Sequence, residues 1–202
     1  MISVGVLALL LILIKYKSSR LVSVFLIISL IACRNMYYTG NVLYRGYYVN
    51  HQHGPDQKEH ITGLIDDIRK KADELVRLSH VEYPGDDRVR RLVNVWNGRI
   101  REMEHQLIKK RVFAYNVNKG DVIAVCMHGN GNNMNHSNEI FFVVMHEMAH
   151  IMTELYEHND EFWDSFRLLI RVASDNGLYV NVDYNQTPTA FCGDFIDHNP
   201  TF

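Results

Sequence analysis

The sequence predicts an α+β protein in which several helices and a short antiparallel sheet form one folded domain. Three observations favour this fold class: two long segments repeat apolar residues at helical spacing, a β-rich hairpin pattern follows them, and a further helical pattern comes next. The chain has 202 residues, 47% of them hydrophobic and 22% charged. This length and composition suffice for one packed domain and an additional segment.

The first 36 residues have the composition of a membrane anchor. The runs 2–14 and 21–33 contain no charged side chain, and the basic stretch KYKSSR separates them. Each run has 13 residues, about 20 Å of helix, whereas a bilayer core of about 30 Å requires roughly 20 residues. A cleaved signal peptide, a helical hairpin and a single span from residue 19 to about 38 are the three alternatives. We expect membrane anchorage by residues 1–36 and contact with lipid.

Residues 37–56 read as a linker that is first aromatic and then polar. Its tyrosines suit either a membrane interface or packing on the domain. Gly54 and Pro55 interrupt any helix. His51 and His53 are therefore expected to be linker residues and not ligands.

Residues 57–202 are expected to form the domain, and they begin with two amphipathic patterns. From about 57 to 78, apolar residues recur three and four apart, opposite a charged face. The segment EYPGDDR stops this helix, and a second one is predicted from about 87 to 110.

A change of period marks the sheet. The runs RVFAYNV and VIAVCM surround the turn NKGD, which is typical of a β-hairpin. The Gly- and Asn-rich stretch 128–138 predicts a loop, and Ser137 is placed to cap a helix that runs through His150. A last helix is expected to begin at NDEFW.

Charge and cysteine content exclude two classes of protein. With 21 basic and 23 acidic residues, the formal charge is −2, so the chain lacks the clustered positive charge that binding to nucleic acid requires. The chain has three cysteines, which is an odd number, and they lie far apart in the sequence. We therefore expect no disulfide framework.

The segment HEMAH contains candidate metal ligands and a candidate general base. Residues four apart stand on one face of a helix, so His146 and His150 can present two imidazoles to one metal ion. Zinc takes neutral imidazole nitrogen, and a carboxylate such as that of Glu147 can exchange protons with water that the metal activates. A pair of core histidines is the alternative.

His158 is the favoured third ligand, because it lies far enough beyond His150 for the chain to fold back. The nearby oxygen donors Glu154, Glu157 and Asp160 stay open as alternatives. More remote candidates are His198, Asp175 and Cys192. Tyr179 and Tyr184 are expected to pack in the core, although a phenol could also stabilise an oxyanion.

The stretch HEMAHIMTELYEHNDEFW resembles the H-E-x-x-H and later H-x-x-x-F-W pattern of the SprT-like and WLM-like zinc metallopeptidases. The resemblance covers about residues 121–199 and implies a small zincin-like domain. It implies that His146, His150 and His158 bind Zn²⁺ and that Glu147 is the general base. It further implies that the strand VIAVCM lies along the cleft and pairs with an extended peptide.

The tail YNQTPTAFCGDFIDHNP is similar to uncharacterised metallopeptidase-like proteins of large icosahedral DNA viruses. This likeness adds the interface between a virion inner membrane and its capsid as a location, with capsid or other assembly proteins as partners. Two functions follow. One is a membrane-anchored, zinc-dependent endopeptidase that uses a metal-activated water with Glu147 as general base. The alternative is a structural or assembly protein, such as a minor capsid component, that retains a zincin fold.

Overall fold

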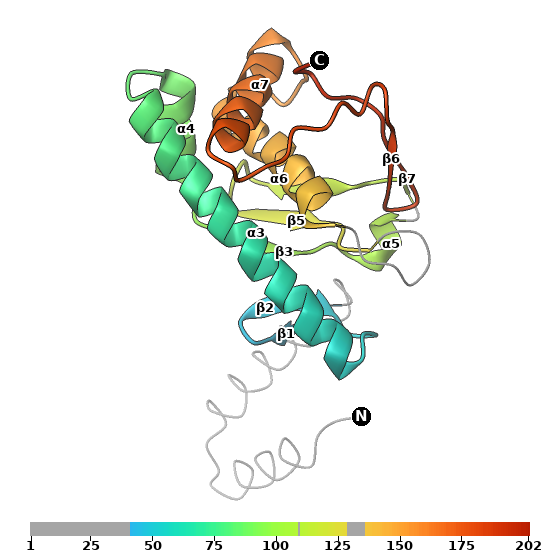
Figure 1. The fold of residues 1–202 in the computed structure, drawn as a ribbon. Helices are drawn as coiled ribbons and strands as arrows, with labels where there is room; N and C mark the ends of the chain where they lie inside the picture. The colour runs from blue at the N-terminus through green and yellow to red at the C-terminus, as the bar shows by residue number, and fades with distance from the viewer. Residues whose placement is uncertain (1–40, 109, 129–135) are drawn as a thin grey trace, which may run out of the picture. The chain divides into compact units, whose positions relative to one another are not determined.

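The computed structural model describes residues 41–108, 110–128 and 136–202 (Figure 1). The helices in this part of the chain are α3 (Pro55–Glu82), α4 (Asp87–Val95), α5 (His105–Ile108), α6 (Ser137–Met152) and α7 (Asp160–Asp175). The strands are β1 (Asn41–Tyr44), β2 (Tyr47–Asn50), β3 (Ile100–Glu102), β4 (Ala114–Val117), β5 (Val122–Val125), β6 (Thr189–Phe191) and β7 (Asp194–Ile196). The prediction of an α+β protein is confirmed.

A three-stranded sheet has the order β3-β5-β4, with β5 in the middle. β4 and β5 form the predicted antiparallel hairpin, in which Ala114 pairs with Val125 and Val117 with Val122. β3 pairs with the other side of β5 in parallel. Because β5 has neighbours on both sides, its apolar sequence is almost fully buried.

The predicted helix 87–110 is wrong beyond Val95. α4 ends there, Gly98 adopts a φ of +71°, and the chain then extends into β3. The backbone of this segment bonds to β5: Ile123 N–H donates to the Arg99 carbonyl and Met103 N–H to the Val125 carbonyl, both at 2.9 Å. The apolar residues of this segment have helical spacing, but its backbone pairs with the edge of β5. This pairing outweighs the local preference for a helix.

The first predicted helix is confirmed as α3, which is longer than the expected 57–78. Ile61, Ile65 and Ile68 of its apolar stripe are completely buried. The opposite face carries ion pairs between residues three and four apart, such as Asp66 with Arg69 and with Lys70. α3 crosses the molecule diagonally in Figure 1 and contacts the sheet, α6 and α7.

Part of the predicted linker 37–56 is a hairpin. β1 and β2 pair antiparallel around Arg45 and Gly46, whose φ angles of 47° and 89° are those of a tight primed turn. Tyr47 donates its hydroxyl to Asp66 on α3 at 2.9 Å. The hairpin is thereby attached to the domain, and the packing alternative for this tyrosine is the one observed.

α6 lies at the centre of the fold. It packs against β4 and β5 on one side and against α7 on another (Figure 1). Nearly all of its side chains from Ile140 to Met152 are buried. Ser137 does not cap this helix as predicted: His136 is the N-cap residue, and the Ser137 hydroxyl instead donates to Asp67 and accepts from Lys71, both at 2.8 Å.

The structure contains a disulfide, which corrects the expectation drawn from the cysteine count. Cys126, just after β5, is bonded to Cys192 in the turn between β6 and β7, with a Cα–Cα distance of 6.3 Å. The two cysteines are 66 residues apart in sequence. Only the fold brings them together, so spacing along the chain gave no indication of the bond.

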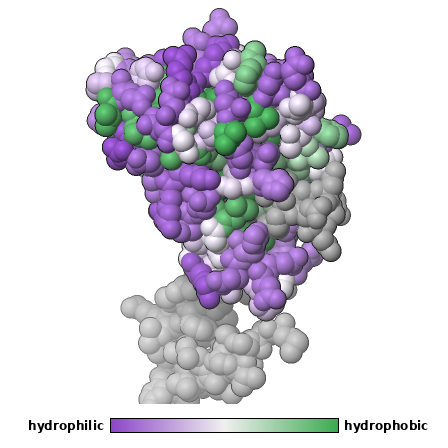
Figure 2. Space-filling view, viewed as in Figure 1, coloured by the Kyte–Doolittle hydropathy of each residue, from purple (hydrophilic) through white to green (hydrophobic). Residues whose placement is uncertain are grey.

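The expectation of a membrane-anchored protein is also corrected. None of the helices in residues 41–202 that the structure describes combines the length and the apolar character needed to cross a bilayer. α3 is long enough, but one face is charged. The surface in Figure 2 is mostly hydrophilic, with apolar residues in separate small groups. The segments 2–14 and 21–33, on which the expectation was based, lie outside the described residues.

Candidate metal centre

The helix α6 presents two histidines from an otherwise apolar element. His146 and His150 are one turn apart and only partly buried, whereas their neighbours Met145, Met148 and Ala149 are completely buried. The helix ends at Met152, and the chain then turns so that His158 approaches the same face. The structure thus brings together the three histidines that the sequence singled out.

The three imidazoles meet through their Nε2 atoms. His158 Nε2 lies 3.2 Å from His146 Nε2 and 3.1 Å from His150 Nε2. One ring nitrogen carries either one hydrogen or one lone pair in the ring plane, so His158 Nε2 cannot form two good hydrogen bonds at once. A cation between the three rings would satisfy all of them. Zn–N distances of 2.0–2.1 Å in a tetrahedral site correspond to N–N separations of about 3.3–3.4 Å, close to those observed.

Aromatic side chains from α7 support the three rings. The Phe162 ring centroid lies 4.9 Å from that of His146, 4.5 Å from that of His150 and 4.4 Å from that of His158. Trp163 contacts His158 at 5.6 Å. The FW pair at the start of α7 therefore fixes the ring positions by packing.

The segment that carries His158 is held at both ends. The ammonium of Lys119, in the β4–β5 turn, donates to the Thr153 carbonyl at 2.8 Å and also to the next carbonyl. Arg91 Nε donates to the Met152 carbonyl at 2.6 Å. At the other end Asn159 caps α7 by accepting from Phe162 N–H at 3.0 Å. Carbonyls exposed where α6 ends are thus satisfied by side chains.

Burial controls the charge of the cluster. It lowers the pKa of His146 to about 3, with a smaller contribution from His150 and His158, and lowers the pKa of His150 to about 4. It also lowers the pKa of His158. The three rings are therefore neutral near pH 7, which is the form that binds metal.

Glu147 is the buried carboxylate next to the cluster. Glu147 is only 7% exposed, and this burial raises the pKa of its carboxyl group to about 7. Its backbone carbonyl accepts a hydrogen bond from Asn116 Nδ2 on β4 at 3.0 Å. The edge strand β4 consequently lies alongside the histidine-bearing helix.

The other candidate residues lie elsewhere. His198 Nδ1 contacts Asn185 Oδ1 at 2.9 Å, and Cys192 is consumed by the disulfide. Asp175 ends α7 and lines a separate pocket. Tyr179 and Tyr184 are buried against Phe142, with ring centroids at 6.0 and 5.0 Å, as expected for core residues. Glu154, Glu157 and Asp160 are exposed and are not in the described histidine group.

The resemblance placed β5 along a substrate cleft, and the structure corrects this assignment. β5 is hydrogen-bonded to β3 on one side and to β4 on the other, so neither of its edges can accept a peptide. Among the strands that the structure describes, β4 is the one with an outer edge next to α6. The error arose because no local pattern indicates β3.

A second group of potential metal ligands was missed in the sequence. His53, Glu102 and His128 also offer ligand atoms within 4.8 Å of one another. They come from the turn after β2, the end of β3 and the segment that follows β5. His53 lies in the predicted linker, and Glu102 lies in the part of the predicted helix 87–110 that is strand β3 in the structure; no local motif connects the three.

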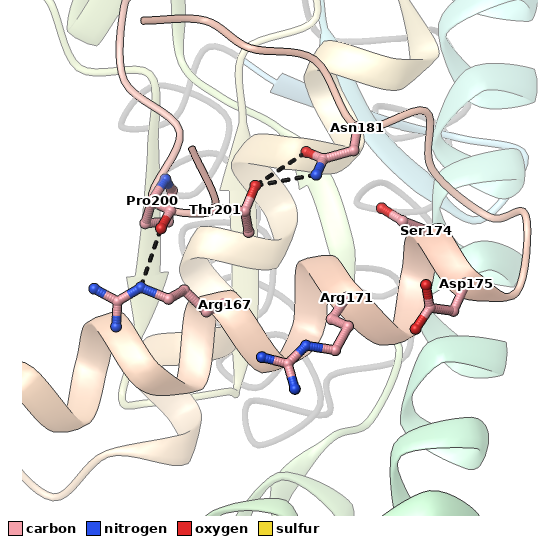
Figure 3. A pocket seen from close by; sticks show the side chains of 7 residues that line it. All are labelled: Arg167, Arg171, Ser174, Asp175, Asn181, Pro200 and Thr201. Atoms are coloured by element: carbon pink, nitrogen blue, oxygen red, sulfur yellow. Dashed lines mark hydrogen bonds between the residues drawn. The ribbon is translucent and has the colours of Figure 1, made fainter.

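A pocket of about 270 Å³ lies on the C-terminal half of α7 and the end of the chain (Figure 3). Its lining residues are Arg167, Arg171, Ser174, Asp175, Asn181, Pro200 and Thr201. Several of its polar groups bond within the wall: Arg167 Nε donates to the Pro200 carbonyl, and Asn181 Nδ2 to the Thr201 hydroxyl, both at 3.0 Å. These bonds attach the C-terminal segment to α7, and no histidine of either group lines the pocket.

Comparison with known proteins yields one informative likeness. The chain is 24% identical over 166 residues to an uncharacterized protein of Acanthamoeba polyphaga mimivirus, covering 81% of this chain and 83% of the relative. No family model matches the chain. No solved structure matches it either. The likeness connects the chain to a giant-virus protein, in keeping with the viral resemblance of its tail, and it carries no information on activity.

Proposed function

We propose that the protein is a zinc-dependent endopeptidase with a zincin-like arrangement of its active site. The observation that carries this proposal is the convergence of three histidine Nε2 atoms beside a helix that also bears a buried glutamate. Two of the histidines and the glutamate are in the order H-E-x-x-H on α6. That order combines two metal ligands with a general base.

The donor set suits zinc. Three neutral imidazoles are a known zinc ligand set that leaves one position for water or substrate. Zinc bound there would polarise water and lower its pKa. His146, His150 and His158 would hold the ion, and Phe162 and Trp163 would keep the rings in place. Glu147 would accept a proton from water and return it to the leaving amine.

We propose an extended peptide as the substrate class, bound along β4. Cys126 N–H donates to the Phe113 carbonyl, so the directly opposed residues Phe113 and Cys126 form a hydrogen-bonded pair of the ladder. By alternation, the backbone groups of Ala114 and Asn116 point away from β5, toward the outer edge of the sheet. An extended peptide could pair with these groups. Peptides N-methylated at alternate residues should be cleaved more slowly, and equal rates would contradict this binding mode.

The test of catalysis is the substitution Glu147→Gln in the full chain. The amide has nearly the shape of the carboxylate and is not a metal ligand, so zinc content should be unchanged. It cannot act as a base, so cleavage of an unstructured peptide library should fall by about 10²- to 10⁴-fold. Cleavage products are measured by mass spectrometry at matched zinc content.

Glu157→Gln is the matched control, because Glu157 is an exposed glutamate on the segment that leads to His158. This variant should cleave as the wild type does. Equal cleavage by wild type and Glu147→Gln would contradict the proposed mechanism. Absence of cleavage by every variant would favour a structural or assembly role for the same fold.

A further inference from the structure

We propose that His53, Glu102 and His128 form a second binding site for a divalent transition-metal ion. The site shares no residue with the histidine cluster on α6 and does not depend on the peptidase function proposed above. It would connect three segments that are remote in sequence: the turn after β2, the end of β3 and the segment that follows β5.

The three ligand atoms form a small triangle. His53 Nε2 lies 2.8 Å from Glu102 Oε1, His128 Nε2 lies 3.0 Å from the same oxygen, and the two Nε2 atoms are 2.9 Å apart. The side chain of Glu102 is 3% exposed, and those of His53 and His128 are 12% and 19% exposed. A carboxylate is therefore buried with both imidazole nitrogens directed at one of its oxygens.

No placement of hydrogens makes all three contacts favourable. If both Nε2 atoms carry hydrogens for Glu102, two donors face each other across 2.9 Å. If one Nε2 atom carries none, its lone pair faces the carboxylate oxygen. A carboxylate oxygen can accept from two N–H donors, but the two imidazole nitrogens at 2.9 Å then conflict with each other, and a cation between the three atoms removes this conflict. A divalent cation supplies that charge and accepts a lone pair from each atom.

The surroundings hold the carboxylate as a ligand. Glu102 Oε2 accepts from Asn50 N–H at 2.7 Å, which leaves Oε1 for the two histidines. The Glu102 carbonyl accepts from Asn41 Nδ2 at 2.9 Å. Both asparagines belong to the β1–β2 hairpin and are buried. Such supporting bonds orient a ligand before the metal binds.

The donor set selects the class of ion. Two imidazoles and one carboxylate suit zinc or another first-row transition metal, whereas magnesium and calcium prefer oxygen ligands. The edges of 2.8–3.0 Å would widen by a few tenths of an ångström to reach the about 3.3 Å of a tetrahedral zinc site. Small movements of the two partly exposed rings suffice.

The test is a count of bound zinc. The full chain is dialysed against Zn²⁺, freed of excess metal and analysed by elemental mass spectrometry. Wild type should bind about two zinc ions per chain, and His128→Ala about one. His60→Ala is the matched control, because this exposed histidine on α3 is in neither group, and it should bind as wild type does.

Glu102→Gln is a second variant that tests the same site if His128→Ala fails to fold. The amide keeps the size of the side chain and an oxygen for the Asn50 N–H, so circular dichroism should be unchanged while zinc affinity at one site falls at least tenfold. A folded Glu102→Gln or His128→Ala protein with wild-type zinc content and affinity would overturn the proposal.

His150→Ala separates this inference from the peptidase proposal. It should also lose one zinc ion, and the double variant His128→Ala/His150→Ala should retain almost none. If His128→Ala loses one ion and His150→Ala loses none, the second site stands and the peptidase proposal fails. If only His150→Ala loses an ion, the opposite holds.

Discussion

At the scale of single residues, the identity of the third ligand decides what the α6 histidines can do. Two ligands on one helix bind a metal weakly, and the third must come from another segment. His158 reaches the pair because residues 153–159 are held by Lys119 and by the Asn159 cap. The oxygen donors around it stay in solvent.

The substitution His158→Ala should therefore lower zinc affinity at this centre by at least about 100-fold, because it removes one of three ligands. His198→Ala is the control. His198 is outside the cluster, and its ring contacts Trp163 and Asn185. Competition titration with a chromogenic chelator measures both affinities. Equal losses in the two variants, or no loss in either, would rule out the assignment.

The sequence predicted one histidine group and missed the other for a physical reason. His146 and His150 are related by the helical repeat, and His158 follows eight residues after His150, so periodicity and proximity were enough. Glu102 is 49 residues from His53 and 26 from His128. The pairing of β3 with β5 brings Glu102 close to His128, and the contact of β2 with β3 brings His53 to the same place. Neither contact has a local signature in the sequence.

At the scale of secondary structure, the elements with strong local patterns were predicted and those created by pairing were not. The stripe on α3, the β4–β5 hairpin and the start of α7 are all visible in the sequence. β3 has only three residues within an apparently helical pattern. It is a strand because its backbone completes the sheet, which no pattern within the segment reveals.

The turn between β4 and β5 shows how closely these elements fit. Gly120 has a φ of +123°, and a Cβ atom there would overlap Val95 of α4 and lie 3.4 Å from Ile151 of α6. Gly120→Ala should lower the free energy of unfolding by about 1–3 kcal/mol through strain and overpacking. Urea denaturation measures the change.

Gly63→Ala is the matched control for that measurement. Gly63 lies on the exposed face of α3, and a Cβ atom there would have nothing within 4 Å. Alanine favours the helix, so this variant should be more stable by up to about 1 kcal/mol. A Gly120→Ala protein as stable as Gly63→Ala would contradict the packing described around the turn.

At the scale of the whole molecule, the disulfide joins the sheet to the C-terminal hairpin. Both sulfur atoms lie close to the His128 carbonyl, at 3.3 Å for Cys126 and 3.2 Å for Cys192. The bond thus holds the end of β5 near the second proposed metal site. Cysteine number and spacing could not predict it, because the partner is selected by the fold.

Reduction of this bond should destabilise the protein by about 2–4 kcal/mol, because the cross-link restricts the unfolded chain. The prediction is checked by thermal denaturation with and without dithiothreitol. The double variant Cys126→Ser/Cys192→Ser should have the lower midpoint in both conditions. An identical midpoint for oxidised and reduced wild type would mean that the bond contributes nothing to stability.

The central claim is that His146, His150 and His158 bind zinc, and an anomalous difference map at the zinc absorption edge tests it most directly. Crystals of the full chain grown with Zn²⁺ should show a peak between the three Nε2 atoms, about 2.0–2.1 Å from each. The same map would show whether His53, Glu102 and His128 hold a second ion. A map with ordered rings and no peak among His146, His150 and His158 would contradict the claim.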